Sequence, residues 1–150
     1  MKQTMMKYLG VVATAMMLAP AVSRAQQTQV VELPVVVDTP FVHDPVMAYE
    51  NGKYYLYCTG HGITQMTSSD RKHWTLSQEG VLRNEKISAW THDSVPGFTT
   101  HIWAPDVIKY RNTWYMAYSC STFGKNTSAI GLLSNTSLSN KEGWKDEGCL

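Results

Sequence analysis

An internal repeat with a period of sixty residues restricts most strongly how this 150-residue chain can fold. The string His43-Asp44-Pro45-Val46-Met47 aligns with Trp103-Ala104-Pro105-Asp106-Val107, and at the same offset residues 53–57 (KYYLY) fall on residues 113–117 (TWYMA). A repeat of this kind builds the same structural unit twice, so the fold must be one in which similar units stack side by side.

Each repeat unit has the pattern of a small antiparallel sheet. Its apolar runs are short and rich in aromatic and β-branched residues, and turn formers such as Glu50-Asn51-Gly52-Lys53 separate them. No stretch after the N-terminal segment keeps a helical period for three turns, so we predict an all-β fold. Units of this length with about four strands are typical of β-propeller blades. The alternative is a compact two-sheet sandwich.

A propeller blade buries the two faces of its sheet against neighbouring blades, and a closed propeller needs at least four blades. Residues 41–150 contain two repeats, and the second repeat reaches Leu150 within its last strand pattern. We therefore expect residues 41–150 to be a partial propeller, about the first two blades, that is incomplete at its C-terminus.

The N-terminal segment has the pattern of a secretory signal peptide. Lys2 and Lys7 give it a positive start, residues 9–21 are mostly apolar, and Ser23-Arg24-Ala25 puts small residues at the −3 and −1 positions of a cleavage site. The apolar run is shorter than the ~20 residues that a membrane-spanning helix needs. We expect residues 1–25 to be a signal peptide cleaved after Ala25, which implies a secreted or periplasmic protein. Residues 26–40 are then a loose lead-in segment.

Composition and charge exclude other classes of protein. The chain is 43% hydrophobic and 17% charged, which is too apolar for a disordered protein. The segment up to Ala25 holds 3 of the 13 basic residues and no acidic one, so 10 basic and 12 acidic residues remain and the net charge is −2. We expect an uncharged partner, no nucleic acid, and no membrane association after signal removal.

The cysteines and histidines do not suggest a metal site. Cys58 and Cys120 lie in apolar, strand-like runs, where we expect buried free thiols, and Cys149 is the third cysteine. The five histidines show no HExxH string and no other paired spacing of ligands.

Five strings in a fixed order carry the functional information. They are Val42-His43-Asp44-Pro45, then Asn51-Gly52-Lys53-Tyr54-Tyr55, then Thr67-Ser68-Ser69-Asp70 followed by Trp74, then Trp103-Ala104-Pro105-Asp106, and finally residues 121–131 (STFGKNTSAIG). Together they resemble glycoside hydrolase family 43, and within it the arabinan endo-1,5-α-L-arabinosidases, or arabinanases. The resemblance covers residues 41–150, which are identified as the N-terminal portion of such an enzyme.

This resemblance implies a five-bladed β-propeller with its substrate cleft at one end of the central channel. It implies hydrolysis with inversion by three carboxyl groups: an Asp as general base, an Asp that tunes the acid, and a Glu that protonates the leaving oxygen. Only the general base has a counterpart here, which is Asp44. The resemblance further implies that Trp103 and Phe123 bind the sugar beside Asp44. Gly124 is added to this binding site because a glycine next to Phe123 would let the backbone approach a ligand closely. No cofactor is expected within these residues, although a channel cation such as calcium is implied for the full-length fold.

Each of these site residues has a plainer interpretation. Asp-Pro is a common turn pair, so Asp44 is alternatively an ordinary turn residue. Trp103 and Phe123 are alternatively core aromatics, which is the commoner role of such side chains. His43 either orients the Asp44 carboxylate or packs beneath it.

Asp106 is interpreted as a structural residue, and two N-glycosylation patterns are left open. Asp106 falls on Val46 in the repeat alignment and not on Asp44, so we expect it to hold loop backbone by hydrogen bonds and not to complete a carboxylate pair. The strings Asn126-Thr127-Ser128 and Asn135-Thr136-Ser137 match the N-glycosylation pattern.

The predicted function is a secreted hydrolase of arabinan, whose partner is an arabinan-like polysaccharide or oligosaccharide. Because two of the three carboxyl groups have no counterpart here, we expect the 150-residue chain alone to be inactive. Two alternatives remain. One is a related β-xylosidase or exo-acting α-L-arabinofuranosidase, and the other is a non-catalytic carbohydrate-binding propeller module, which would need Trp103 and Phe123 but not Asp44.

Overall fold

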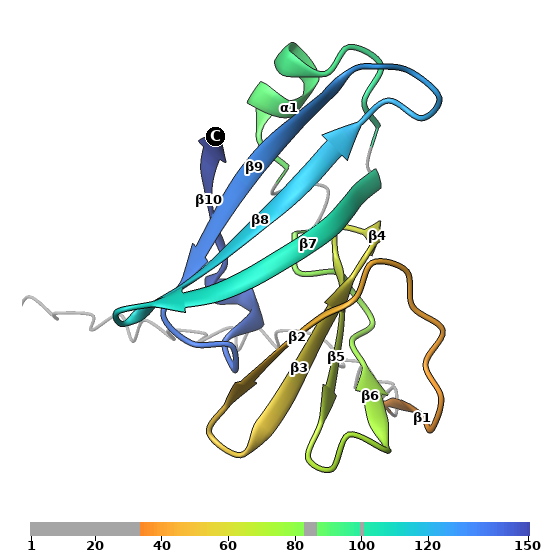
Figure 1. Cartoon of the computed structure of the whole chain (residues 1–150), viewed down its shortest axis with the longest axis vertical. Coiled ribbons are helices and arrows are strands. Elements are labelled where there is room, and N and C mark those ends of the chain that lie inside the picture. The colour runs from red at the N-terminus through yellow and green to blue at the C-terminus, as the bar shows by residue number, and fades with distance from the viewer. Residues whose placement is uncertain (1–33, 83–86, 100) are drawn as a thin grey trace, which may run out of the picture. The chain divides into compact units, whose positions relative to one another are not determined.

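Two antiparallel five-stranded sheets make up most of the described chain (Figure 1). The computed structural model describes residues 34–82, 87–99 and 101–150, so the expected signal peptide and the start of the lead-in segment lie outside the described residues. The first sheet has the order β1-β6-β5-β3-β2 and consists of β1 (Val35–Val37), β2 (Val46–Glu50), β3 (Lys53–Cys58), β5 (Thr64–Ser68) and β6 (Trp74–Leu76). The second has the order β10-β9-β8-β7-β4 and consists of β4 (Gly60–His61), β7 (His101–Tyr110), β8 (Thr113–Ser121), β9 (Ser128–Asn135) and β10 (Lys145–Cys149).

Helical structure is short in the described part of the chain. The helix α1 (Ala89–Ser94) has six residues, and the 3-10 turn η2 (Lys141–Gly143) has three. The prediction of an all-β fold is therefore confirmed. No helix among the described residues is both long enough and apolar enough to cross a lipid bilayer.

The sixty-residue repeat appears directly in the strand register. Val46 pairs with Tyr57 in the first sheet, and Asp106 pairs with Ala117 in the second, sixty positions later for both partners. In each sheet four strands form a meander, β7-β8-β9-β10 in the second sheet and β2-β3-β5-β6 in the first, where only the short strand β4 interrupts the order; this is the connectivity of a propeller blade.

The turn predicted at residues 50–53 is also confirmed. Asn51 and Gly52 both have left-handed backbones, with φ of 50° and 82°, between the paired residues Glu50 and Lys53. Such two-residue turns match the twist of the strands they join, and Asn-Gly adopts them at little cost.

The lead-in segment is more ordered than the sequence analysis predicted. Val35–Val37 forms β1, which pairs with Trp74–Leu76 at the outer edge of the first sheet. Three β-branched residues in a row favour an extended backbone, and the otherwise open edge of β6 supplies the hydrogen-bonding partners.

The chain crosses between the two sheets immediately after β3. Strand β4 pairs with β7 of the second sheet, and the chain then returns to the first sheet as β5. Gly60 allows this tight excursion, because a Cβ atom there would collide with the side chain of Thr64. A strand of the first repeat thus belongs to the sheet of the second (Figure 1).

The apolar core lies between the facing sides of the two sheets. Alternate residues of β3 and β8 point into it, and the ring of Trp144 meets that of Tyr57 edge-on at 6.1 Å between centroids. The largest fully buried core side chains are Tyr57, Tyr118, Ile63, Leu82, Ile102, Met116, Leu133 and Leu138. Cys58 and Cys120 are buried and not joined in a disulfide, as expected.

A buried carboxylate also links the two sheets. Glu50, at the end of β2, has a side chain only 8% exposed and accepts hydrogen bonds at 2.7 Å from Trp114 Nε1, Ser137 Oγ and the backbone N–H of Leu138. Burial opposes its charge, but these bonds outweigh burial and hold the pKa of Glu50 at about 2. The carboxylate is therefore ionised, and it joins the first sheet to β8 and to the connection after β9.

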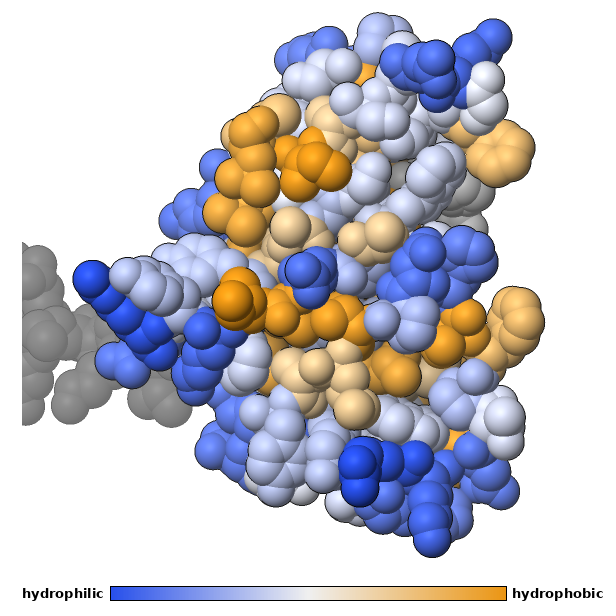
Figure 2. Space-filling model, viewed as in Figure 1, coloured by the Kyte–Doolittle hydropathy of each residue, from blue (hydrophilic) through white to orange (hydrophobic). Residues whose placement is uncertain are grey.

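The sides of β2 and β7 that face away from the core carry exposed apolar residues. Met47 and Tyr49 on β2, and Ile108 and Tyr110 on β7, are each about half exposed or more. Figure 2 shows apolar residues gathered across the middle of the viewed face. Patches of this kind are what neighbouring blades of a propeller cover.

Candidate active site

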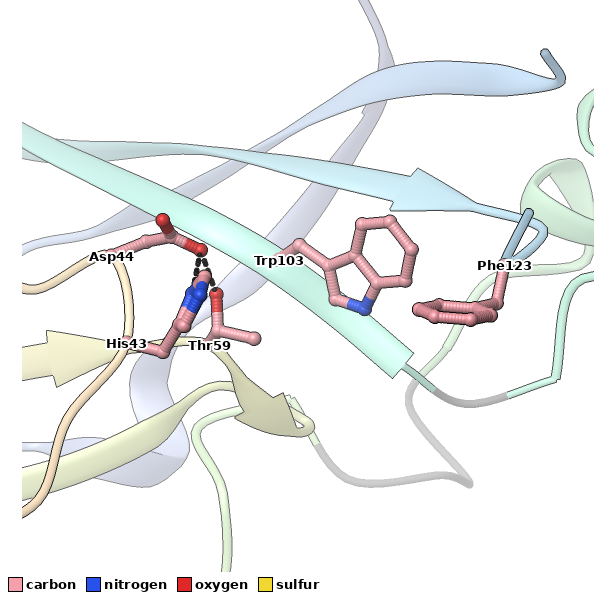
Figure 3. A pocket seen from close by; sticks show the side chains of 5 residues that line it. All are labelled: His43, Asp44, Thr59, Trp103 and Phe123. Carbon is pink, nitrogen blue, oxygen red and sulfur yellow. Dashed lines mark hydrogen bonds and ion pairs between the residues drawn. The ribbon is translucent and has the colours of Figure 1, made fainter. Parts of the chain in front are cut away.

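A pocket of about 650 Å³ opens where the starts of β2 and β7 come together (Figure 3). Its walls are His43, Asp44, Thr59, Trp103 and Phe123. The pocket therefore draws on both repeats: the segment before β2 and the end of β3 provide one side, and β7 with the β8–β9 loop provides the other.

The backbone conformation of Asp44 places this residue just before β2. It adopts a left-handed conformation with φ of 50°, directly before Pro45 and two residues before β2 begins. Asp tolerates this conformation better than most residues, because its short side chain can bond locally. The carboxylate is 40% exposed and faces the pocket.

Two hydrogen bonds converge on one oxygen of this carboxylate. Thr59 Oγ1 donates to Asp44 Oδ2 at 2.7 Å, and His43 Nδ1 lies 2.7 Å from the same oxygen (Figure 3). The bonds from Thr59 and then His43 lower the pKa of Asp44 below its ordinary value, because they stabilise the charged form. Asp44 is thus ionised at neutral pH, which is the state that a general base requires.

An aromatic corner forms the other side of the pocket. The rings of Trp103 and Phe123 are 6.1 Å apart between centroids and nearly perpendicular, at 79°. Phe123 is 85% exposed, so it is not a core residue, and Thr122 beside it donates a hydrogen bond of 2.6 Å to the carbonyl of Pro96. Trp103 is partly buried and, like Phe123, lines the pocket, so two flat rings at nearly a right angle offer surfaces for the C–H face of a sugar ring.

The structure brings together three of the four residues predicted to bind the substrate. Asp44, Trp103 and Phe123 line the same pocket, whereas Gly124 is not among its lining residues. Gly124 instead turns the β8–β9 loop with φ of 72°, next to Phe123.

Thr59 lines the pocket but was missed by the sequence analysis. Its position directly after an apolar strand gives no sign that it reaches Asp44, fifteen residues earlier. The repeat alignment contains the only hint: Thr59 aligns with Ser119, so both repeats place a hydroxyl at this point.

The role expected for Asp106 is wrong. Its side chain is exposed on β7, and it forms no hydrogen bond with any residue that the structure describes. Asp106 lies where the pairing with β8 resumes after a register shift, and its exposed carboxylate reaches no described backbone group.

The two glycosylation patterns differ in exposure. Asn126 is exposed in the β8–β9 loop, whereas Asn135 is 4% exposed and its Nδ2 donates to the carbonyl of Asn140 at 2.7 Å. Asn135 is therefore inaccessible in the folded chain.

A cluster of metal-ligating side chains was not found in the part of the chain that the structure describes. Within the described ranges, no three His, Cys, Asp or Glu side chains lie close enough together to hold a metal ion.

Comparison with known proteins identifies the class of molecule that this fold and pocket form. The family model of glycosyl hydrolases family 43 matches residues 33–150, and the chain belongs to this family. It is of the arabinanase type, and its two sheets are blades of the five-bladed β-propeller that such enzymes share.

The relatives are described as enzymes of arabinan breakdown. The chain is 42% identical over 110 residues to an extracellular exo-α-(1→5)-L-arabinofuranosidase of Cellvibrio japonicus, covering 71% of this chain and 31% of the relative. It is 41% identical over 111 residues to an extracellular endo-α-(1→5)-L-arabinanase of Bacillus subtilis, covering 71% and 33%. The chain thus spans about a third of the length of these curated relatives.

A solved structure confirms the architecture. An exo-1,5-α-L-arabinanase from a bovine ruminal metagenomic library is 49% identical and superposes with a TM-score of 0.67, over 75% of this chain and 36% of the other. The match favours the propeller over the two-sheet sandwich.

Proposed function

We propose that this chain belongs to a secreted, inverting glycoside hydrolase that cleaves arabinan, with Asp44 as its general base. One observation carries the proposal: an exposed, ionised carboxylate shares a pocket with a perpendicular pair of aromatic rings, the exposed Phe123 and the partly buried Trp103. An ordinary turn aspartate would not need such a neighbourhood. The names of the relatives point to arabinan as the substrate.

The roles of the residues follow from their chemistry. The sugar to be cleaved packs against Trp103 and Phe123, which have few rotamers to restrict and so hold it at low entropic cost. Asp44 removes a proton from a water molecule, which attacks the anomeric carbon from the carboxylate side. Inversion needs an acid about 6.5–9.5 Å away across the sugar. No other carboxylate lines the described pocket, so we assign the general acid to no residue of this chain.

The decisive test is Asp44→Asn in the protein at its full natural length, assayed on linear arabinan. General-base catalysis contributes about 10²–10⁴-fold, so kcat should fall by that factor while KM changes little. Asp106→Asn is the matched control and should leave both parameters unchanged. A variant Asp44→Asn with wild-type kcat would refute Asp44 as the general base, whereas binding of arabinan without any turnover by the wild-type full-length protein would favour the non-catalytic module. The 150-residue chain alone should show no turnover.

Exo action is a second candidate, because two of the relatives described above are named as exo-acting enzymes. Early products from linear arabinan separate the two modes. An endo-acting enzyme releases a mixture of oligosaccharides, whereas an exo-acting enzyme releases products of one size.

The proposed secretion has its own test. Both curated relatives are described as extracellular, which supports export. N-terminal sequencing of the exported protein should begin at Gln26 if cleavage follows Ala25. Recovery of the exported protein with residues 1–25 attached would refute the proposed signal peptide.

A further inference from the structure

Thr59 connects three segments of the chain at the base of the pocket. Its backbone N–H donates to the carbonyl of His43 at 3.0 Å, and its hydroxyl donates to Asp44 Oδ2 at 2.7 Å. The same hydroxyl oxygen accepts a hydrogen bond of 2.9 Å from the backbone N–H of Ala104. One hydroxyl thus uses both its donor and its acceptor capacity to connect a side chain of the first repeat with the backbone of the second.

The backbone of the second sheet is shaped to provide this bond. Strand β7 has a register shift between Trp103 and Asp106, and Ala104 within it has φ of 45°. The shift takes Ala104 out of the pairing with β8, so its N–H is free to bond elsewhere. An alanine in this left-handed region is strained, because its Cβ crowds the following carbonyl oxygen, and such strain often occurs at functional sites.

Of the two groups bonded to the carboxylate, Thr59 is the more firmly placed. The His43 side chain is 76% exposed, so water competes for its bond to Asp44. Thr59 is only partly exposed, it lies at the crossing from β3 to β4, and its hydroxyl is fixed on both sides.

We propose that Thr59 is a positioning residue for the general base: its hydroxyl ties Oδ2 of Asp44 to the Ala104 backbone and so leaves Oδ1 to activate water. In Figure 3 the second oxygen of Asp44 points away from both His43 and Thr59, and it has no hydrogen bond to any described residue. This inference rests on the proposed function of Asp44. The lowered pKa of Asp44, to which the Thr59 bond contributes most, agrees with it.

The test replaces Thr59 in the full-length protein and follows the pH profile of arabinan hydrolysis. Thr59→Val keeps the shape of the side chain but removes the hydroxyl, and Thr59→Ser keeps the hydroxyl. Thr59→Ala is a second variant without a hydroxyl, in case valine disturbs folding. Thr75→Val on β6 is the control, since this partly buried threonine has no side-chain hydrogen bond to any residue that the structure describes.

We expect Thr59→Val to lower kcat by about 10–100-fold, because misplacing a reacting group by about 1 Å costs on the order of 100-fold. KM should change little, because Trp103 and Phe123 are untouched. The acid limb of kcat/KM should move to higher pH, because the pKa of Asp44 rises when it loses a donor. Thr59→Ser should restore both kcat and the limb, and Thr75→Val should match the wild type.

Three results would overturn the proposal. They are an unmoved acid limb in Thr59→Val or Thr59→Ala, a failure of Thr59→Ser to restore it, and loss of folding in both hydroxyl-free variants, which would make Thr59 a purely structural residue. These results can be distinguished from failure of the proposed function. That failure would appear as full activity of the Asp44→Asn variant, independently of the results for the Thr59 variants.

Discussion

The two repeats share a left-handed backbone conformation at one pair of equivalent residues, just before β2 and near the start of β7. They carry different side chains there. Asp44 and Ala104 occupy equivalent positions, both lie directly before a proline, and their φ angles are 50° and 45°. The first repeat places an imidazole and a carboxylate at this turn, whereas the second places an indole and a methyl group. The pocket therefore has a charged side and an apolar side, built on one backbone turn used twice.

A second pair of equivalent positions differs in a similar way. Glu50 ends β2 and Tyr110 ends β7, sixty residues later. Glu50 is buried and bonded to the neighbouring sheet, whereas Tyr110 is 59% exposed. At equivalent positions, the residue that faces a neighbouring sheet bonds to that sheet. The residue that no described residue covers is exposed to solvent.

The largest effect on stability should come from breaking the Glu50 link. Glu50→Gln should lower the free energy of unfolding by about 3 kcal/mol at pH 7, since a pKa lowered from 4.5 to about 2 corresponds to roughly that amount. Because the folded state has the lower pKa, this stabilisation is present above about pH 5 and is lost as pH falls toward 2. Denaturant unfolding at several pH values measures it.

The matched control for this link is the equivalent residue Tyr110. Tyr110→Phe, compared with Glu50→Gln in the 150-residue chain where Tyr110 is exposed, should change stability by less than about 0.5 kcal/mol. A Glu50→Gln variant that loses stability in parallel with the wild type between pH 5 and 2 would contradict the assignment.

Substitutions on the two sides of the pocket should affect different kinetic parameters. Trp103→Ala should raise KM for arabinan about tenfold, or about 1.4 kcal/mol, because it removes a wall on which the sugar packs. His43→Ala, at the equivalent position of the first repeat, should instead lower kcat, since it removes a bond to the base. Steady-state kinetics separates the two effects, and Trp103→Phe should recover most of the binding. An unchanged KM in Trp103→Ala would place the sugar elsewhere.

The smallest effect concerns the shared backbone turn. Ala104→Gly should raise the free energy of unfolding by roughly 0.5–1 kcal/mol, because glycine avoids the left-handed strain of 1–2 kcal/mol but adds entropy to the unfolded chain. Ala117→Gly in β8, where the backbone is an ordinary strand, should instead destabilise by about 0.5–1 kcal/mol. Thermal unfolding of both variants gives the comparison, and a loss of stability in Ala104→Gly would mean that the turn is not strained.

The sequence predicted those parts of the fold and site that depend on local pattern. The repeat predicted two similar small antiparallel sheets of about four strands each, and the motif strings predicted Asp44, Trp103 and Phe123. Gly124 was placed in the site because it adjoins Phe123, but a loop residue can turn its neighbour toward a pocket without lining that pocket itself.

Features that depend on the meeting of distant segments were not predictable. Thr59 reaches Asp44 only because the chain crosses between sheets at that point, and Ala104 bonds to it only because β7 has a register shift. The strand β1 forms because the edge of β6 is open to it, and Glu50 is buried because the second sheet covers it. Each of these contacts joins residues whose proximity is set by sheet packing, which no short string encodes.

The passage of β4 into the neighbouring sheet has a consequence for engineering. The first repeat cannot be cut out as a cassette without exposing the edge of β7, and the second cannot be kept without the residues that pair with it. Transplanting this site into another scaffold would require moving both repeats as one piece, with the Thr59 crossing intact.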